Sequence, residues 1–102
     1  MRLEWLPAAQ EDRDAIYDFI NAESRRGALR VDNAIEQQAD RLVEYPYSGR
    51  MGRALDTREL IVVGTPCIVI YRVDTDRILV LRVIHTAQSW SDDSAYRSSI
   101  QD

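Results

Sequence analysis

The chain opens with an alternating pattern of apolar and charged residues and continues with a helical one. Leu3 and Trp5 alternate with charged neighbours, which predicts a short strand over residues 2–6. Pro7 then suits the first turn of a helix, where its missing N–H group costs nothing. Acidic residues come early in this helix, where the helix dipole favours negative charge: Glu11, Asp12 and Asp14. Its apolar residues fall roughly on one face: Ala8, Ala9, Ala15, Ile16, Phe19 and Ile20.

A second helical segment follows a break in the pattern at residues 25–27. Its apolar residues recur at helical spacing: Ala28, Val31, Ala34, Ile35, Ala39, Leu42 and Val43. The segment ends before Pro46, because a proline disfavours helical backbone at the residue before it. The first half of the chain is therefore predicted to be a strand followed by a helical hairpin.

The second half contains three runs rich in Val, Ile and Leu, at residues 58–63, 67–73 and 77–84, which predict strands. The short segments between them suit hairpins. Residues 47–53 read as a loop because of their two glycines. The order β-α-α-β-β-β indicates an α+β fold, followed by a polar tail at 91–102.

Strict alternation along the last run makes a specific prediction about two functional candidates. Arg82 is expected to share a face with Ile78 and Val80. His85 is expected to share the other face with Leu81 and Val83.

Composition removes several classes of protein. The 102 residues suffice for one domain, with 13 arginines, no lysine, one histidine and one cysteine. Catalysis by a lysine side chain, such as Schiff-base formation, is therefore excluded. One His and one Cys cannot form a structural zinc site. A single cysteine forms no internal disulfide, which fits a reducing compartment. We expect no metal and no cofactor. No apolar stretch reaches the length of a signal peptide or membrane helix, which predicts a cytoplasmic protein without membrane contact.

The charge is unevenly distributed along this acidic chain, whose net charge is −4. Residues 1–49 carry six arginines and ten acids, whereas residues 50–90 carry six arginines and four acids. A cationic segment inside an acidic protein is the more informative part for binding.

Several side chains in this cationic half are candidates for chemistry, each with a structural alternative. Arginines from the loop and the strands could converge to grip a phosphate or carboxylate, or simply keep an exposed face soluble: Arg53, Arg58, Arg72 and Arg82. His85 at a strand end could act as an acid, a base or a ligand, or bond to nearby backbone. Trp90 could close the core or contact a partner.

Two further features favour structural roles. Cys67 begins a strand, where a lone cysteine is more often a packed residue than a reactive thiol. The Gly49–Gly52 segment has the G-x-x-G form of a nucleic-acid clamp, but it lies between a helix and a strand, which favours a simple turn.

Four segments together resemble the RelE/ParE superfamily of bacterial type II toxin–antitoxin toxins. They are LEWLPAAQEDRDAIYDFI (3–20), GRMGRALDTRELIVVG (49–64), CIVIYRV (67–73) and LRVIHTAQSW (81–90). The resemblance covers residues 2–90 and implies a single toxin domain at 1–90, with a helical hairpin packed on a small, mainly antiparallel sheet.

This superfamily implies two different activities on one fold. RelE-like members cleave messenger RNA in the ribosome, whereas characterised ParE-like members poison DNA gyrase. The ribosomal nucleases usually have an arginine three residues before the tyrosine of the third strand, where this chain has Ile68. The missing arginine, the absence of lysine and the acidic charge favour the ParE-like branch, with no enzymatic activity. A ribonuclease would use His85 and Arg82 as its catalytic residues. A third alternative is a non-toxic binding module.

The resemblance also implies contact residues and a partner. Candidate contacts to the target, DNA gyrase in the ParE-like reading, are Arg53, Arg58, Arg82, His85, Gln88 and Trp90. The partner is a ParD-like antitoxin with a ribbon-helix-helix DNA-binding half, so this chain itself needs no sequence-specific DNA binding. An antitoxin helix could fill a groove beside the helical hairpin, and an extended segment could add to a sheet edge. Candidate groove residues are Ile16, Phe19, Ile20, Ala34, Ile35 and Leu42.

Overall fold

The computed structural model describes residues 1–87 and has an α+β architecture. Predictions for Gln88, Trp90 and the tail at 91–102 lie outside these residues. The elements in chain order are β1 (Arg2–Trp5), α1 (Pro7–Asn21), α2 (Arg25–Asp40), the 3₁₀ helix η1 (Arg41–Val43), β2 (Arg50–Met51), β3 (Arg58–Val62), β4 (Cys67–Val73) and β5 (Arg77–His85).

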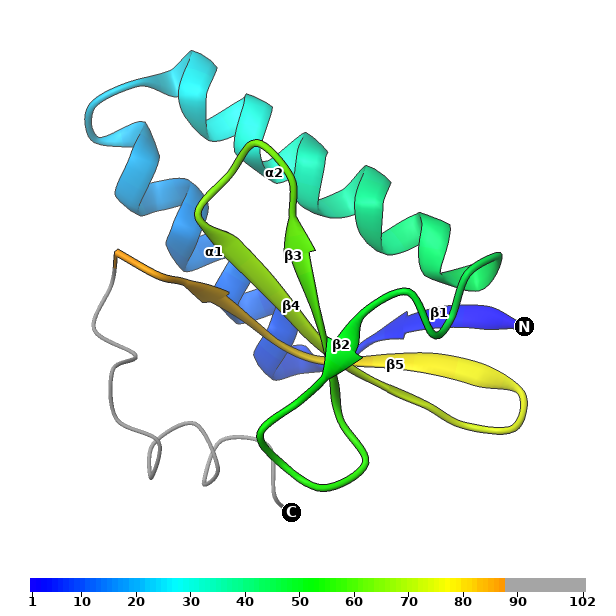
Figure 1. The fold of residues 1–102 in the computed structure, drawn as a ribbon. Coiled ribbons are helices and arrows are strands. Elements are labelled where there is room, and N and C mark those ends of the chain that lie inside the picture. The colour runs from blue at the N-terminus through cyan, green and yellow to red at the C-terminus, as the bar shows by residue number, and fades with distance from the viewer. Residues whose placement is uncertain (88–102) are drawn as a thin grey trace.

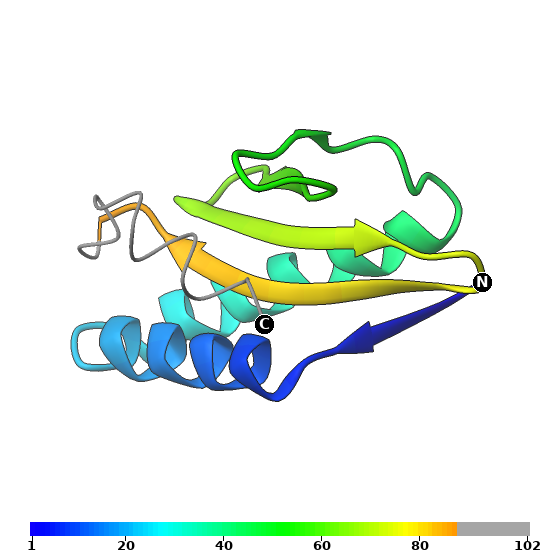
Figure 2. The ribbon, with the colours of Figure 1, turned by 90° about the horizontal axis from the view of Figure 1, so that it is seen from below.

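One five-stranded mixed sheet has the spatial order β1-β5-β4-β3-β2. β1 runs parallel to β5, and the other neighbours are antiparallel. Both long helices cover the same face of this sheet (Figures 1 and 2). The predicted α+β class, with a helical hairpin on a mainly antiparallel sheet, is confirmed.

The long strands match the sequence prediction closely, but one short strand was missed. β4 has the predicted bounds, and β3 and β5 differ from theirs by one residue at the end. The segment predicted as a loop contains β2, whose Arg50 pairs with Glu59 and whose Met51 pairs with Arg58. Two residues are too few to produce a visible alternation, so no periodic signal indicated this strand.

The break between the helices lies earlier than the sequence suggested. Ser24 caps α2, and its hydroxyl accepts a 2.9 Å hydrogen bond from the Gly27 N–H. Residues 25–27 therefore belong to α2, and the interpretation of them as an interruption was wrong. The reason is that a serine N-cap satisfies a free N–H at the helix start, which outweighs the low helix propensity of one glycine.

Two apolar residues assigned to the buried face of α1 lie outside it. Ala15 is exposed, and the Phe19 side chain is 52% exposed. Between them Ile16 is buried, and Asp12 is buried one turn earlier. The buried stripe of α1 is narrower than predicted because an acidic residue, rather than Ala15, occupies it.

A β-bulge in β5 changes which residues share a face. Ile70 pairs with Arg82 whereas the next residue, Tyr71, pairs with Val80, so Leu81 has no direct partner across the strand pair. The extra residue reverses the alternation beyond it. Consequently Val83 lies in the same core cluster as Val80, and Leu81 lies in a different one. His85 and Val83 share a face as predicted, but their grouping with Leu81 was wrong, and so was the grouping of Arg82 with Val80.

The core lies mainly between the helices and the sheet. Its buried residues under the helices are Ala9, Ile16, Val31, Ile35, Val62, Cys67, Val69, Val80 and Val83. Cys67 is 1% exposed, and its burial raises the pKa of the thiol, as expected for a packed residue. Alternate residues of β4 and β5 form a second buried cluster with a loop residue: Ala54, Ile70, Leu79, Leu81 and Ile84.

Candidate functional site

Arg82 is held by a carboxylate from the first helix. Its Nε and Nη2 donate hydrogen bonds of 2.7 and 2.8 Å to the two carboxylate oxygens of Asp12. The backbone N–H of Val83 donates a further 2.9 Å bond to Asp12 Oδ2. The Arg82 side chain is only 14% exposed, and the bond to Asp12 raises the pKa of the guanidinium. This fork geometry fixes Arg82 and joins α1 to the bulged segment of β5.

His85 ends β5 in a buried position. It is 5% exposed, and its ring meets the ring of Phe19 edge-on at a centroid distance of 5.6 Å. Nδ1 accepts a 3.2 Å hydrogen bond from the Ala87 N–H, which places the proton of the neutral ring on Nε2. Burial lowers the pKa of His85, so the ring is neutral near pH 7. The backbone-bonded alternative noted from the sequence is the one observed.

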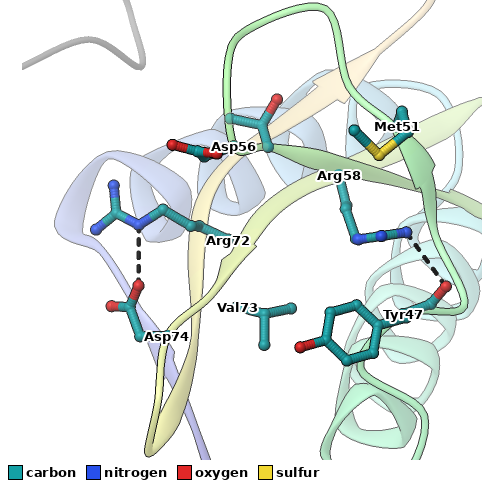
Figure 3. Close-up of a pocket in the computed structure, with 8 residues that line it drawn as sticks. Tyr47, Met51, Asp56, Arg58, Arg72, Val73 and Asp74 are labelled. Carbon is teal, nitrogen blue, oxygen red and sulfur yellow. Dashed lines mark hydrogen bonds and ion pairs between the residues drawn. The ribbon is translucent and has the colours of Figure 1, made fainter.

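Arg58 lies at a hollow of about 320 Å³ near the start of β3 and the end of β4 (Figure 3). Its Nη1 donates to the carbonyl oxygens of Gly49 at 2.8 Å and Tyr47 at 3.4 Å. Its guanidinium carbon lies 4.9 Å from the centre of the Tyr47 ring, a cation–π contact. The hollow is lined by Tyr47, Met51, Asp56, Thr57, Arg58, Arg72, Val73 and Asp74.

Arg72 lines the same hollow but is engaged by an acid. Its Nε donates to Asp74 Oδ1 at 3.2 Å, and Arg77 approaches the other oxygen of Asp74 at 3.4 Å. Arg77 also donates to Glu4 at 2.7 Å. Of the four arginines considered from the sequence, Arg58 and Arg72 line the same hollow, but their guanidinium groups point away from each other (Figure 3). Arg82 is bound to α1.

The loop that carries Tyr47 is fixed by a buried tyrosine. The Tyr71 hydroxyl donates to the Pro46 carbonyl at 2.8 Å and accepts from the Gly49 N–H at 2.9 Å. A Cβ atom at Gly49 would lie 2.6 Å from this hydroxyl oxygen, and one at Gly52 would lie 2.2 Å from the hydroxyl of Thr57. Close packing therefore requires both glycines. The two residues between them form β2, so the interpretation of the G-x-x-G segment as a simple turn was wrong.

The far end of β3 forms an open edge beside a second hollow of about 670 Å³. Gln38 of α2 occupies this edge at Val63: its Nε2 donates to the Val63 carbonyl at 3.0 Å, and its Oε1 accepts from the Val63 N–H at 2.8 Å. Ile61 is 51% exposed and Val63 is 76% exposed. The hollow is lined by Gln38, Arg41, Glu44, Tyr45, Ser48, Leu60, Ile61 and Val63.

The other predicted site residues are scattered. Arg53 is exposed, and its backbone N–H lies 3.4 Å from Glu59 Oε2. Three groove candidates are at most 4% exposed and belong to the chain's own core: Ile16, Ile35 and Leu42. Ile20 and Ala34 are partly buried against that core, which leaves Phe19 as the exposed member of the set.

Three residues that shape these surfaces were not identified from the sequence: Asp12, Gln38 and Tyr47. Asp12 was assigned to the helix dipole, although its position on the stripe between Ala9 and Ile16 indicated a buried carboxylate that needs a cation. Gln38 and Tyr47 carry no motif, and only the folded structure brings them to β3.

Neither a metal centre nor a membrane helix is found in the described part of the chain. Residues 1–87 contain no group of three or more His, Cys, Asp or Glu side chains placed to hold a metal ion. None of the helices in these residues has the length and apolarity needed to cross a bilayer.

Comparison with known proteins identifies the family. Residues 3–90 match the family model described as the ParE toxin of the type II toxin–antitoxin system parDE. The chain belongs to the ParE toxin family. It is therefore a type II toxin of the RelE/ParE superfamily, as the resemblance of its segments implied.

Two relatives align with most of this ParE-family chain. It is 38% identical to the protein Y4kP of Sinorhizobium fredii over an alignment of 89 residues. The alignment covers 87% of this chain and 92% of Y4kP. It is also 36% identical to a Caulobacter vibrioides protein named Toxin RelE2 over an alignment of 84 residues. This alignment covers 82% of this chain and 93% of that protein.

Two solved structures from toxin–antitoxin systems share the fold. A chain of the chromosomal ParDE system from P. aeruginosa superposes with a TM-score of 0.75 at 30% identity, over 83% of this chain and 95% of that one. A chain of the RelBE2 toxin–antitoxin complex from Mycobacterium tuberculosis gives a TM-score of 0.63 at 21% identity, over 82% and 95%. The second likeness concerns the fold alone.

Proposed function

We propose that this toxin inhibits DNA gyrase by binding it, without catalysing a reaction, and is neutralised by a ParD-like antitoxin in the cytoplasm. The ParE family match and the 30% identity to a chain of a ParDE system support this branch of the superfamily. The side chains at the end of β5 supply the physical argument.

The observation that carries the proposal is the fork between Arg82 and Asp12. A ribonuclease of this fold would need Arg82 to stabilise a phosphate and His85 to move a proton. Two of the Arg82 nitrogens are bound to Asp12 at 2.7 and 2.8 Å, and His85 is buried with Nδ1 bonded to backbone. Ile68, partly buried on β4, also supplies no cation. These side chains serve the fold instead of presenting a reactive pair.

The antitoxin would neutralise the toxin through surfaces that the fold leaves open. The outward backbone groups of β3 beyond β2 offer hydrogen bonds to an added strand. The hollow beside them and the exposed ring of Phe19 offer apolar contact to an amphipathic segment. The antitoxin, through its ribbon-helix-helix half, would supply the DNA recognition of the hetero-oligomer.

A supercoiling assay with antitoxin-free protein tests the gyrase target. As the toxin concentration rises, we expect gyrase to lose its ability to supercoil relaxed plasmid, and we expect cleaved DNA to accumulate on the enzyme. The matched control is toxin mixed first with its antitoxin, which should restore supercoiling. Full supercoiling at every toxin concentration, from protein that arrests growth when expressed, would exclude gyrase as the target. Normal growth on expression would instead favour the non-toxic binding module.

A RelE-like, ribosome-dependent ribonuclease is the second candidate, because a relative of 36% identity carries the name Toxin RelE2. This activity predicts cuts at codon positions in a message undergoing translation. The cuts should disappear in both His85→Ala and Arg82→Ala variants that remain folded by circular dichroism. An intact message in a translation extract containing the toxin would exclude this candidate.

A further inference from the structure

Arg58 differs from the other partly buried arginines of residues 1–87. Residues 1–87 contain five partly buried arginines, and four of them pair with carboxylates: Arg13 with Asp32, Arg72 and Arg77 with Asp74, and Arg82 with Asp12. Arg58 alone has no carboxylate within ion-pair distance in this part of the chain. Its partners are the Tyr47 ring and two backbone carbonyls. A partly desolvated cation without an anion is a prepared site for one.

The guanidinium of Arg58 is also held in a fixed orientation. Both contacts to carbonyl oxygens use Nη1, at 2.8 and 3.4 Å. Gly49, which supplies the shorter contact, is itself bonded to the buried Tyr71 hydroxyl at 2.9 Å. Nε and Nη2 make no hydrogen bond to any residue within 1–87, and this edge of a guanidinium is the one that accepts a carboxylate through two parallel bonds.

The walls of the hollow favour one carboxylate with an apolar neighbour over a nucleic acid. Met51 is 73% exposed beside the hollow, and Val73 lies near the Tyr47 ring (Figure 3). Asp56 and Asp74 also line it, and the charge of Arg72 is taken up by Asp74. Nucleic-acid binding requires contacts to several phosphates, whereas Arg58 is the one cation of this hollow that has no carboxylate partner within residues 1–87. A volume of about 320 Å³ fits one or two side chains.

We propose that this hollow docks an acidic segment of the antitoxin, in which an Asp or Glu carboxylate binds the Nε–Nη2 edge of Arg58 and an adjacent apolar side chain covers Val73 and Met51. The inference rests on the proposed antitoxin partner and on the charge complementarity of the hollow. It adds a polar anchor near the start of β3 to the apolar contacts expected at its open edge.

Binding of small peptides tests the chemistry of the hollow alone. The probes are acetyl-Glu-Leu-amide and acetyl-Gln-Leu-amide, added at millimolar concentration to ¹⁵N-labelled toxin. We expect the Arg58 Nε–H signal and the Tyr47 amide signal to shift with the first probe and to stay in place with the second. Equal shifts from both probes, or larger shifts from a dinucleotide, would overturn the acidic-peptide assignment.

Antitoxin affinity tests the role of the hollow in the complex. The probe is the ParD-like antitoxin of the proposed function, to be sought as the product of a short reading frame adjacent to the toxin gene. We expect Arg58→Gln to weaken its binding by about tenfold to a hundredfold, because a desolvated charge contact is lost. Met51→Glu should weaken it similarly by placing a competing carboxylate at the hollow, and this exposed position carries little risk to folding. Arg26→Gln, at an exposed residue of α2, is the control and should change affinity less than twofold.

The outcomes separate this inference from the proposed function. If Met51→Glu and folded Arg58→Gln both bind antitoxin within twofold of the unaltered toxin, the hollow is not a docking site and the antitoxin partnership stands. If the unaltered toxin itself does not bind the adjacent gene product, the partnership fails as well. A loss of affinity in Met51→Glu decides in favour of the hollow even where Arg58→Gln does not fold.

Discussion

Asp12 of α1 grips Arg82 of β5 through both carboxylate oxygens, at 2.7 and 2.8 Å, and also accepts the Val83 N–H at 2.9 Å. The contact joins residues 70 positions apart at the point where the Leu81 bulge interrupts β5. β1 pairs with β5 only as far as Val80, and the Asp12 carboxylate takes up the Val83 N–H beyond the end of that pairing. Asp12 thus serves as an ion-pair partner and as a backbone acceptor.

Replacing Asp12 should destabilise the fold strongly. Asp12→Asn keeps the size of the side chain but removes the negative charge that binds the partly buried Arg82 guanidinium. We expect a loss of about 2–4 kcal/mol in the free energy of unfolding, since removing one charge of a buried, doubly hydrogen-bonded ion pair is strongly destabilising. Urea unfolding followed by circular dichroism measures it. Asp14→Asn, at an exposed position of the same helix, is the control. Equal stability of the two variants would show that the Arg82 fork contributes little.

The example of Asp12 shows how far the sequence predicts such a site. Helical periodicity correctly placed α1 and the buried Ile16, and Arg82 was recognised as a candidate. Nothing in a single sequence pairs two residues 70 positions apart, so Asp12 was assigned to the helix dipole instead. A charged residue on an apolar stripe is the usable signal, because burial of a carboxylate requires a compensating cation or several hydrogen bonds.

The stability of the toxin should depend on the protonation of His85. Burial lowers its pKa in the folded state, so the unfolded chain binds the proton first as the pH falls. Stability should therefore decline as the pH drops below about 6.5, the ordinary histidine value, and level off below the folded-state pKa. Urea unfolding of the unaltered toxin and His85→Gln at pH 7.5 and 5.5 isolates this contribution, since the carboxylates are common to both. The loss on acidification should be larger in the unaltered toxin. Identical losses would contradict the assignment of a buried neutral ring.

The faces of β5 illustrate a second limit of sequence reasoning. The run from Arg77 onward was correctly predicted as a strand, since its Val, Ile and Leu content is decisive. His85 was correctly grouped with Val83 but wrongly grouped with Leu81, because alternation carries no mark of an inserted residue. One bulge at Leu81 moves every later side chain to the other face. Any function assigned by alternation beyond a bulge is assigned to the wrong surface.

Tyr71 should matter more for the loop at residues 46–49 than for the sheet. Tyr71→Phe keeps the buried ring but removes the hydroxyl that bonds to Pro46 and Gly49. We expect a loss of about 1–2 kcal/mol in unfolding free energy, because the partly buried Pro46 carbonyl and the buried Gly49 N–H lose their partner. Hydrogen exchange should accelerate selectively at the Gly49 amide. Tyr45→Phe, at a 62% exposed ring, is the matched control and should behave like the unaltered toxin. Unchanged protection at Gly49 in Tyr71→Phe would rule out this anchoring role.

The residues predicted for the antitoxin groove show that an apolar residue at helical spacing need not lie on an accessible surface. The six apolar candidates were chosen by helical spacing, which identifies the side of a helix that packs against something. Ile16, Ile35 and Leu42 pack against the toxin's own sheet, and only Phe19 remains largely exposed. Periodicity cannot separate an intramolecular core from an intermolecular groove, because both require the same apolar spacing.

Gln38 should protect the open edge of β3 from pairing with other chains. Its amide forms two hydrogen bonds with Val63, at 2.8 and 3.0 Å, in the way that a neighbouring strand would. Ladder bonds alternate in direction along an antiparallel strand, so the backbone of Ile61 faces the same open side as that of Val63. Both side chains are at least half exposed. Without Gln38 this edge would present consecutive unpaired groups on an apolar strand, which favours edge-to-edge association.

The test is self-association of Gln38→Ala in the absence of antitoxin. We expect this variant to form dimers or larger species at concentrations where the unaltered toxin sediments as a monomer, with a change in unfolding free energy of only about 1 kcal/mol for the two exposed hydrogen bonds. Gln37→Ala, the exposed neighbour on α2, should remain monomeric. Sedimentation velocity over a hundredfold concentration range distinguishes the two variants. Monomeric Gln38→Ala throughout this range would mean that the twist or the brevity of β3 already protects the edge, and that the amide of Gln38 serves only to hold α2 against the sheet.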